Sequence, residues 1–431
     1  LGSSPSLIIE AKGKNIKITK KGKAQRRSGN PLDIIEKFMR QYKAVAVDGL
    51  PRFYGGLVGY MGYDIIRFIE SIPDSCKDDL GVSDIKLILA DTILIFDRLK
   101  HTIKIVSNTH IKNSSRRATE RAYEQAIKDI HNISKKLSRP LSKSMPQIEG
   151  VSAPISLKSN IKKSAFKKSV IKAKKYIKEG DIIQAVLSQR FQSGFNGDPL
   201  TIYRALRSIN PSPYMFYLSF GSTKLIGSSP EIMVRSEDGI AEIRPIAGTR
   251  PRGKNKKEDE ALEKDLLRDP KECAEHLMLV DLGRNDLGRV CKKGSVRLSE
   301  FMVIERYSHV MHIVSDCVGK LSSKSSIYEL LKSSFPAGTV AGAPKIRAME
   351  IIDELEKTKR GPYAGCVGYF SFSGNLDTCI TIRTILVKGK RAYVQAGAGI
   401  VADSNPEKEY QETVNKAKGM LKAVAIAKAV K

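Results

Sequence analysis

Two pairs of glutamates stand near the start of two predicted helices, and the members of each pair are three residues apart. The pairs are Glu272 with Glu275, which follow Asp269-Pro270, and Glu409 with Glu412, which follow Asn405-Pro406. Asp and Asn are favoured caps and proline suits the first helical position, so both segments predict a helix N-terminus. Residues three apart share a helix face, and four such carboxylates can hold a hard divalent cation through oxygens and waters. The alternative is ordinary capping with solvated acidic faces, because spacing alone does not bring two helices together.

Three glycine-rich segments form a second set of candidate binding residues. They are 245–253 (PIAGTRPRG), 336–345 (PAGTVAGAPK) and 395–400 (QAGAGI). Each adjoins a predicted strand or helix, where backbone N–H groups can approach anionic oxygens. Neither GxGxxG nor GxxxxGK[ST] is present, which disfavours nucleotide binding. Each segment, considered singly, is equally consistent with a tight turn that binds nothing.

The elements that must position these residues predict an α+β fold. Many strand-like segments are hairpin-like neighbours with helices interspersed, which favours large antiparallel sheets over a doubly wound parallel sheet. The glutamates lie on helices predicted near 270–287 and 406–424. Leu87–Phe96 and Thr102–Ser107 predict a β-hairpin, and Leu376–Val387 predicts one long strand.

The Pro/Ser-rich stretch Arg139–Pro154 is the predicted linker between two domains. It separates residues 1–150 from residues 151–431, where the glycine motifs and apolar segments are denser. The N-terminus has no initiator Met, basic segment or apolar segment, so it does not resemble a signal peptide. We therefore expect the true start of the chain to precede Leu1.

Composition limits the class of protein. The 431 residues carry a formal net charge of +28, which raises the alternative of nucleic-acid binding. No zinc finger, RNP motif or basic–aromatic stripe supports that alternative, and we favour a Lys-rich enzyme surface that attracts an anionic substrate. No apolar run approaches the ~20 residues of a membrane span. The six cysteines form no CxxC pair, which indicates reduced thiols and a cytoplasmic enzyme.

Five long motifs occur in order along the C-terminal part of the chain. They are PIAGTRPRG (245–253), DPKECAEHLMLVDLGRNDLGRV (269–290), FPAGTVAGAPKIRAMEIIDELE (335–356), RGPYAGCVGYF (360–370) and QAGAGIVADSNPEKEY (395–410). In these motifs the chain resembles the chorismate-utilising enzyme family, and most closely its anthranilate synthase branch. The resemblance is dense over 161–421 and looser through GGLVGYMGYD (55–64). It implies two β-rich lobes of mainly antiparallel sheet, packed together and flanked by helices, with a regulatory or partner-binding N-terminal lobe and a chorismate-binding C-terminal lobe.

The resemblance also implies roles for individual residues. Glu275 and Glu412 match Mg²⁺ ligands, with Glu272 and Glu409 joined to the metal through water. Glu231 matches the general acid that protonates the departing C4 hydroxyl of chorismate, a role that needs a carboxyl with a raised pKa. Residues at substrate-contacting positions are Gly248, Thr249, Tyr363, Arg383, Gly397, Ala398 and Gly399. Thr339 and His312 match further active-site positions, although His312 is also explicable as a packed structural histidine.

Two positions distinguish the branches of this family. Ala247 stands where some aminodeoxychorismate synthases have a nucleophilic lysine, and Gln184 stands where isochorismate synthases have a lysine that activates water. The resemblance then implies ammonia as the nucleophile, 2-amino-2-deoxyisochorismate as intermediate, and anthranilate with pyruvate as products. Ammonia would come from a separate glutamine amidotransferase subunit, in a heteromer expected to be a heterotetramer. An aminodeoxychorismate synthase of the type without that lysine, and a catalytically silent scaffold, are the alternatives.

Feedback regulation by tryptophan is a further implication. Pro213, Tyr214 and Met215 match the family's tryptophan pocket, although the same residues also describe a proline-fixed turn that leads into a strand. The Leu-Leu-Glu-Ser-like segment that completes this pocket in the family would lie upstream of Leu1. We attribute its absence to the missing start.

Overall fold

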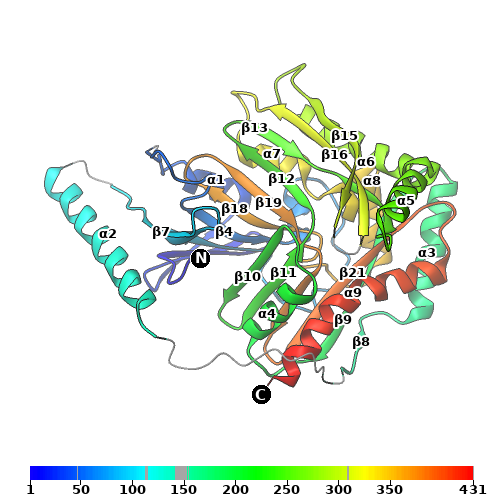
Figure 1. Ribbon diagram of the computed structural model, residues 1–431, viewed down its shortest axis with the longest axis horizontal. Coiled ribbons are helices and arrows are strands. Elements are labelled where there is room, and N and C mark those ends of the chain that lie inside the picture. The colour runs from blue at the N-terminus through cyan, green and yellow to red at the C-terminus, as the bar shows by residue number, and fades with distance from the viewer. Residues whose placement is uncertain (46, 112–114, 141–152, 154, 308–309, 431) are drawn as a thin grey trace. The chain divides into compact units, whose positions relative to one another are not determined.

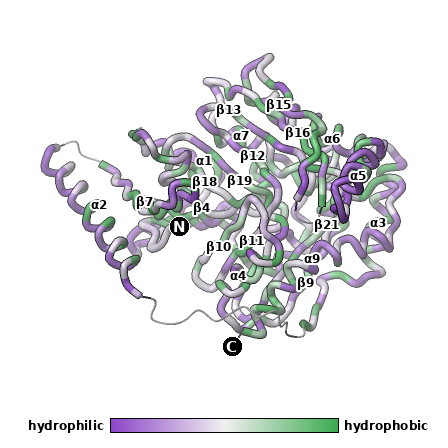
Figure 2. The backbone as a smooth tube through the Cα atoms, viewed as in Figure 1, coloured by the Kyte–Doolittle hydropathy of each residue, from purple (hydrophilic) through white to green (hydrophobic). Residues whose placement is uncertain are grey.

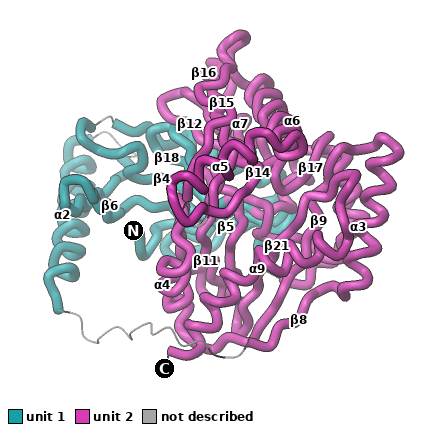
Figure 3. The backbone as a smooth tube through the Cα atoms, turned by 45° about the vertical axis from the view of Figure 1, so that its right-hand side comes forward, with its two compact units in different colours: residues 1–61, 82–145, 367–377 teal, residues 62–81, 146–366, 378–431 magenta. Residues whose placement is uncertain are grey.

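The computed structural model describes residues 1–45, 47–111, 115–140, 153, 155–307 and 310–430. The chain forms two compact units, and neither is continuous in sequence (Figure 3). The first unit comprises 1–61, 82–145 and 367–377, and the second comprises 62–81, 146–366 and 378–431. The boundary expected at residue 150 falls within 141–152, outside the described residues, so the division there stays a prediction.

The first unit is built on an antiparallel sheet in the order β3-β2-β1-β5-β4, with a separate hairpin of β6 and β7. Its elements are β1 (Leu7–Lys12), β2 (Asn15–Lys20), β3 (Lys23–Ser28), α1 (Pro31–Met39), β4 (Gly56–Met61), β5 (Ile85–Ala90), β6 (Thr92–Asp97), β7 (Thr102–Ser107), α2 (Arg116–Leu137) and most of β18 (Cys366–Ser371). The single strand expected at Leu87–Phe96 is wrong, because only Thr92–Asp97 pairs with Thr102–Ser107. Between β5 and β6 the carbonyl of Asp91 accepts hydrogen bonds from the backbone and side-chain N–H groups of Asn108, at 2.7 and 3.1 Å. These bonds hold the chain where it leaves one sheet for the other.

The second unit contains an antiparallel sheet in the order β10-β11-β20-β21-β9-β17, with β8 beside β9. Its strands are β8 (Lys158–Ser159), β9 (Gln184–Gly194), β10 (Tyr214–Phe220), β11 (Thr223–Ser229), β17 (Gly342–Ala343), β20 (Thr384–Lys388) and β21 (Arg391–Ile400). Helices α3 (Lys163–Lys178), α4 (Pro199–Ile209), α8 (Lys345–Leu355) and α9 (Pro406–Ala429) pack on it (Figure 1).

All four helices cover the same face of this sheet. The residues of β21 that join the helix cores are Ala392, Val394, Ala396, Ala398 and Ile400, which alternate along the strand. Since successive side chains point to opposite faces of a strand, the glycines of β21 and the Gln184 side chain of β9 lie on the other face. That face carries the candidate site.

A second antiparallel sheet of this unit has the order β14-β16-β13-β12, with β15 beside β16. Its strands are β12 (Ile232–Glu237), β13 (Ile240–Ile243), β14 (Ile246–Pro251), β15 (Arg297–Arg306) and β16 (Val310–Lys320). Helices α5 (Lys256–Arg268) and α6 (Pro270–Gly288) lie against β14 and β16, where Leu266 and Ile313 are fully buried. Figure 2 shows α5 as hydrophilic along most of its length, which fits a helix that buries only a narrow stripe.

The remaining elements of the second unit are η1 (Tyr63–Phe68), α7 (Ile327–Ser334) and η2 (Gly338–Val340). The long strand expected at Leu376–Val387 is wrong, because β19 (Leu376–Ile380) ends before Thr381 and β20 begins at Thr384. The fold class is confirmed, since large antiparallel sheets are flanked by helices. Among the residues described, no helix is both long and apolar enough to cross a membrane.

Candidate active site

A β-bulge sets the geometry of the first glycine segment. Ala247 pairs with Ile313 and Arg250 with Met311, so Gly248 and Thr249 both stand opposite His312. A bulge of this kind leaves the extra residue unpaired and redirects it. Gly248 has φ +68, a backbone conformation that glycine adopts readily. The first glycine segment, for which a tight turn was one of two expectations, is therefore a strand with a bulge.

His312 is held by that bulge. Its Nδ1 lies 2.9 Å from the Gly248 carbonyl oxygen and 3.1 Å from Thr249 Oγ1. A carbonyl only accepts, so Nδ1 carries the proton and Nε2 is left as an acceptor. Burial lowers the pKa of His312, and the charge of Arg383 lowers it further. The hydrogen bond with the Gly248 carbonyl partly offsets this decrease. The ring is neutral at pH 7 and presents an unprotonated nitrogen.

Both glutamate-bearing helices begin as the sequence predicts. Asp269 accepts from the backbone N–H groups of Lys271 and Glu272, and Asn405 accepts from those of two residues in the first turn of α9. Lys271 Nζ lies 3.2 Å from the Asp403 carboxylate, which ties the start of α6 to the segment before α9. Burial lowers the pKa of Lys271, but Asp403 and the charges of the glutamates on both helices raise it overall.

Each glutamate pair contains one residue whose pKa is raised. Burial raises the pKa of Glu272, and the charge of Glu275 raises it further. Burial and the charge of Glu412 likewise raise the pKa of Glu409. Gln184 Nε2 donates to Glu275 Oε1 at 3.0 Å, and Lys416 Nζ lies 2.5 Å from Glu412 Oε1. Within each pair the like charge of one glutamate disfavours ionisation of the other, and a nearby cation would offset that effect.

The donor set limits which metal could bind here. In the part of the chain that the structure describes, no three His, Cys, Asp or Glu side chains gather closely enough to hold a metal between them. Mg²⁺ is usually bound by only one or two protein carboxylates, together with waters and substrate oxygens. One glutamate from each helix fits that requirement, whereas a structural zinc site would need four protein ligands.

The positions of β21 that face this site are glycines, because the neighbouring side chains leave no room for a Cβ. A Cβ added to Gly397 would lie 2.6 Å from the Tyr363 hydroxyl, and one added to Gly399 would lie 2.6 Å from Gln184 Nε2. Tyr363 and Gln184 therefore lie directly over the strand backbone. The Ala398 side chain is fully buried among the helices on the opposite face, so only its backbone is available to a ligand.

Arg383 lies at the break between β19 and β20. Its backbone has φ +49, which is uncommon for a residue with a side chain and is typical of functional positions. The guanidinium is largely buried, which lowers its pKa, and the charges of Tyr363 and Glu412 act in the opposite direction. Arg383 Nη1 donates to the Lys416 carbonyl at 3.0 Å, while Lys416 Nζ donates to the Gly397 carbonyl at 3.2 Å.

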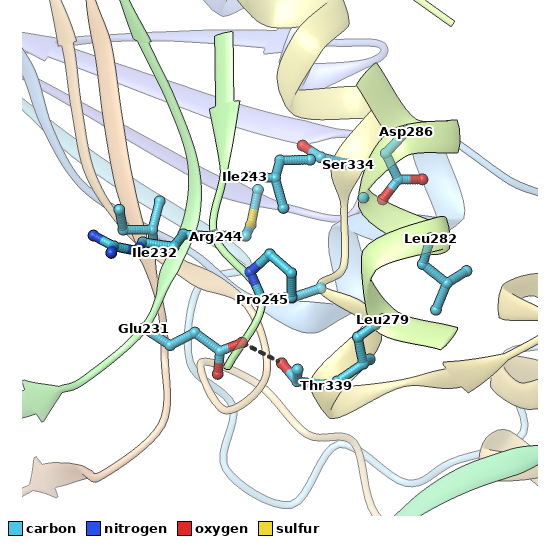
Figure 4. A pocket seen from close by; sticks show the side chains of 14 residues that line it. Glu231, Ile232, Ile243, Arg244, Pro245, Leu279, Leu282, Asp286, Ser334 and Thr339 are labelled. Atoms are coloured by element: carbon cyan, nitrogen blue, oxygen red, sulfur yellow. Dashed lines mark hydrogen bonds between the residues drawn. The ribbon is translucent and has the colours of Figure 1, made fainter. Parts of the chain in front are cut away.

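Glu231 lines a small cavity with Thr339, Leu279, Leu282, Asp286 and Ser334 (Figure 4). The Thr339 hydroxyl donates to Glu231 Oε1 at 3.0 Å. Burial raises the pKa of Glu231 to about 8, against smaller lowering effects of the Thr339 hydrogen bond and the charge of Lys416. At pH 7 this carboxyl is mostly protonated and can give up a proton.

Not all expected residues join this arrangement. Tyr214 and Met215 begin β10, at the end of the sheet order away from β9, and the Tyr214 hydroxyl accepts from Arg235 Nη2 at 3.0 Å. Lys416 also belongs to the site and was not predicted, although its position four residues after Glu412 is a signal for an ion pair. Arg360, which is almost fully buried beside Tyr363, was likewise not predicted.

Comparison with known proteins agrees with this architecture. The model of the family described as chorismate binding enzyme matches residues 4–422. Anthranilate synthase component 1 of Acetivibrio thermocellus is 51% identical over 429 residues, which are 98% of this chain and 86% of that protein. The same component of Aquifex aeolicus is 53% identical, over 92% of this chain and 80% of that protein.

A solved structure extends the likeness to three dimensions. The crystal structure of anthranilate synthase component I from Streptococcus pneumoniae TIGR4 is 39% identical, with a TM-score of 0.87, over 97% of this chain and 91% of that one. The fold and the site thus define a chorismate-binding enzyme. Within that family the chain belongs to the anthranilate synthase component 1 group, which confirms the resemblance seen in the five motifs.

Proposed function

We propose that this chain converts chorismate and ammonia to anthranilate, pyruvate and water, as a step of tryptophan biosynthesis. Amination at the ring with loss of the C4 hydroxyl as water gives 2-amino-2-deoxyisochorismate, and elimination of pyruvate then gives the aromatic product. Membership of the anthranilate synthase component 1 group supports this reaction. The observation that carries it is a buried carboxyl, Glu231, whose pKa of about 8 suits an acid at neutral pH.

Glu231 is the proposed general acid. Its proton passes to the C4 hydroxyl oxygen as the C–O bond breaks, so that water leaves in place of hydroxide. The hydroxyl of Thr339 donates to Glu231 Oε1, which stabilises the carboxylate left after the transfer. His312, with Nε2 unprotonated, is proposed as an acceptor for a substrate hydroxyl or a proton.

Glu275 and Glu412 are the proposed Mg²⁺ ligands, with Glu272 and Glu409 in contact through water. Bound there, the metal would neutralise the ring carboxylate of chorismate and orient the ring. Lys416 contacts Glu412 and Gln184 contacts Glu275, so both carboxylates are held by a polar partner. The raised pKa values of the two neighbouring glutamates support a site that favours an added cation.

The remaining substrate contacts follow from charge and space. Arg383 is proposed to pair with the enolpyruvyl carboxylate, because a buried guanidinium matches a carboxylate in two hydrogen bonds. Tyr363 lies over the β21 backbone beside it. Gly248, Thr249 and the 397–399 backbone would offer N–H groups and a hydroxyl to the other substrate oxygens.

Two positions favour ammonia as the nucleophile. Ala247 is paired with Ile313 within β14 and has no nucleophilic atom. Gln184 is buried, donates to Glu275 and cannot act as a base toward water. We propose that ammonia is supplied by a glutamine amidotransferase subunit, in a cytoplasmic heterotetramer. We also propose that residues 1–150 form the regulatory lobe and that Pro213, Tyr214 and Met215 line a tryptophan inhibitor pocket.

A product assay tests the reaction. Purified chain with chorismate, Mg²⁺ and ammonium at alkaline pH should give fluorescent anthranilate and an equal amount of pyruvate without any partner. An aminodeoxychorismate synthase, the alternative, would consume chorismate without releasing pyruvate. Isochorismate as product would instead contradict the interpretation of Gln184. No turnover by well-folded chain would reject the proposal.

A further inference from the structure

A buried ion pair, Arg360 with Glu356, lies beneath the candidate site and has no role in the chemistry proposed above. Arg360 is 2% exposed and Glu356 is 8% exposed. The two meet along one edge of the guanidinium, with Nε 2.9 Å from Glu356 Oε2 and Nη2 2.7 Å from Oε1. The backbone N–H and the hydroxyl of Ser188 also donate to Oε1, each at 2.8 Å.

Such a pair needs a reason beyond stability. Desolvation of two charges often cancels their attraction, so apolar residues of similar volume hold a fold as well or better. A planar guanidinium has five N–H donors in fixed directions, which suits it to hold several acceptors in a defined arrangement. The remaining donors of Arg360 therefore indicate its role.

Those donors bind the backbone on two sides of the site. Nη1 donates to the Val340 carbonyl at 2.8 Å, and Val340 ends the short turn η2 that carries Thr339. Nη2 also donates to the Val186 carbonyl at 2.6 Å, on β9 two residues after Gln184. The same guanidinium thus joins the turn that supports the proposed acid to the strand that supports a proposed metal ligand.

Arg360 also contacts a predicted substrate-binding ring. Its Cζ lies 5.6 Å from the centroid of Tyr363 and 4.7 Å from that of Tyr63. Guanidinium groups are attracted to aromatic faces at these distances. Because the Tyr363 hydroxyl lies against Gly397, a ring braced by Arg360 fixes one wall of the substrate pocket.

We propose that Arg360, oriented by Glu356, is a positioning residue that holds the Thr339 turn, strand β9 and the Tyr363 ring in register around the substrate. The effect of Arg360 on catalysis rests on the proposed function, but its positioning of Thr339 does not. If the turn moves, Thr339 no longer donates to Glu231, and the carboxylate form of Glu231 loses stabilisation. The titration of Glu231 therefore reports on Arg360 without any turnover.

The test measures this titration by infrared spectroscopy on the full chain, with Glu231→Gln identifying the carboxyl band. Arg360→Lys keeps the charge but cannot reach both carbonyls and Glu356 together. We expect its Glu231 midpoint to move to higher pH, in the same direction as in Thr339→Val, and the double variant to show no additional shift. With substrate, kcat should fall about 10²-fold, as misplacement by about 1 Å can cause.

Arg67→Lys is the matched control. Arg67 is also largely buried, pairs with Asp353 on α8 and Asp64 on η1, and contacts none of the proposed site residues. It should lower Tm while the Glu231 midpoint and kcat stay unchanged. Should Arg360→Lys fail to fold, Glu356→Gln with Arg360→Met removes both buried charges and should show the same shift.

The outcomes are distinct for the two proposals. A Glu231 midpoint that is unchanged in both Arg360 variants, with a Tm loss like that of Arg67→Lys, overturns the positioning role. A shifted midpoint in the Arg360 variants, together with no turnover of chorismate by the unsubstituted chain, supports the positioning role and rejects the proposed reaction.

Discussion

Glu231→Gln is the substitution that most sharply separates the proposed acid from a merely buried carboxyl. The pKa of Glu231 is raised from 4.5 to about 8 because burial penalises the carboxylate. At about 1.4 kcal/mol for each pH unit, this rise corresponds to about 5 kcal/mol against ionisation. Roughly nine in ten Glu231 side chains are then protonated at pH 7, compared with about one in 300 for an exposed glutamate.

The rate should follow that protonated fraction. We expect kcat/KM for chorismate, corrected for the concentration of unprotonated ammonia, to fall tenfold for each pH unit above about 8. Glu231→Gln cannot donate a proton and should lose roughly 10²- to 10⁴-fold in rate. Its remaining activity should show no decline above pH 8, and stopped-flow anthranilate fluorescence from pH 6 to 10 would measure both.

Stability gives a second measurement that needs no substrate. A raised acid pKa means that the folded chain binds this proton more tightly than the unfolded chain does. The stability that the proton provides is complete below pH 4.5 and decreases as pH rises toward about 8. Above about pH 8 this contribution is lost, and stability no longer changes with the titration of Glu231. Glu231→Gln lacks this decrease, so its Tm should rise relative to the unsubstituted chain between pH 5 and 9. An upper pH limit that persists in the variant, together with parallel Tm curves, would refute the assignment.

Three further substitutions test other parts of the site. Glu275→Gln should abolish Mg²⁺-dependent turnover without loss of Tm, and full activity would exclude Glu275 as a ligand. Thr339→Val should move the upper pH limit to higher pH, since the hydrogen bond from Thr339 lowers the pKa of Glu231, and a limit moved down would contradict that bond. Gly397→Ala would place a Cβ 2.6 Å from the Tyr363 hydroxyl and displace that ring, so we expect KM for chorismate to rise severalfold. Initial rates over a range of chorismate concentrations would measure KM, and an unchanged KM would mean that Tyr363 does not contact the substrate.

The sequence predicts those features that depend on neighbouring residues. The caps Asp269 and Asn405 are where the proline-containing segments indicate, and both helices begin as expected. Capping depends on a few consecutive residues, so it can be predicted from the local sequence. The lack of a side chain at Gly397 and Gly399 is likewise evident from the sequence itself. The motifs also place the chain in its family without any knowledge of its pairing.

Features that depend on pairing between distant strands could not be predicted in this way. Two consecutive residues, Gly248 and Thr249, stand opposite His312 only because of the register between β14 and β16. The break at Arg383 occurs because β19 and β20 belong to different sheets. In the sequence, residues 376–387 are rich in Ile, Val and Thr throughout, which predicts one continuous strand. Arg360 has no local pattern that marks its contacts with Val186 and Val340, which are 174 and 20 residues away.

A crystal structure of the Glu231→Gln variant with Mg²⁺ and chorismate tests the proposed site most directly. We expect one carboxylate oxygen from each of Glu275 and Glu412 within about 2.1 Å of the metal, and the amide introduced at position 231 facing the C4 hydroxyl. Glu275 and Glu412 turned toward bulk solvent, with chorismate bound elsewhere, would contradict the proposal.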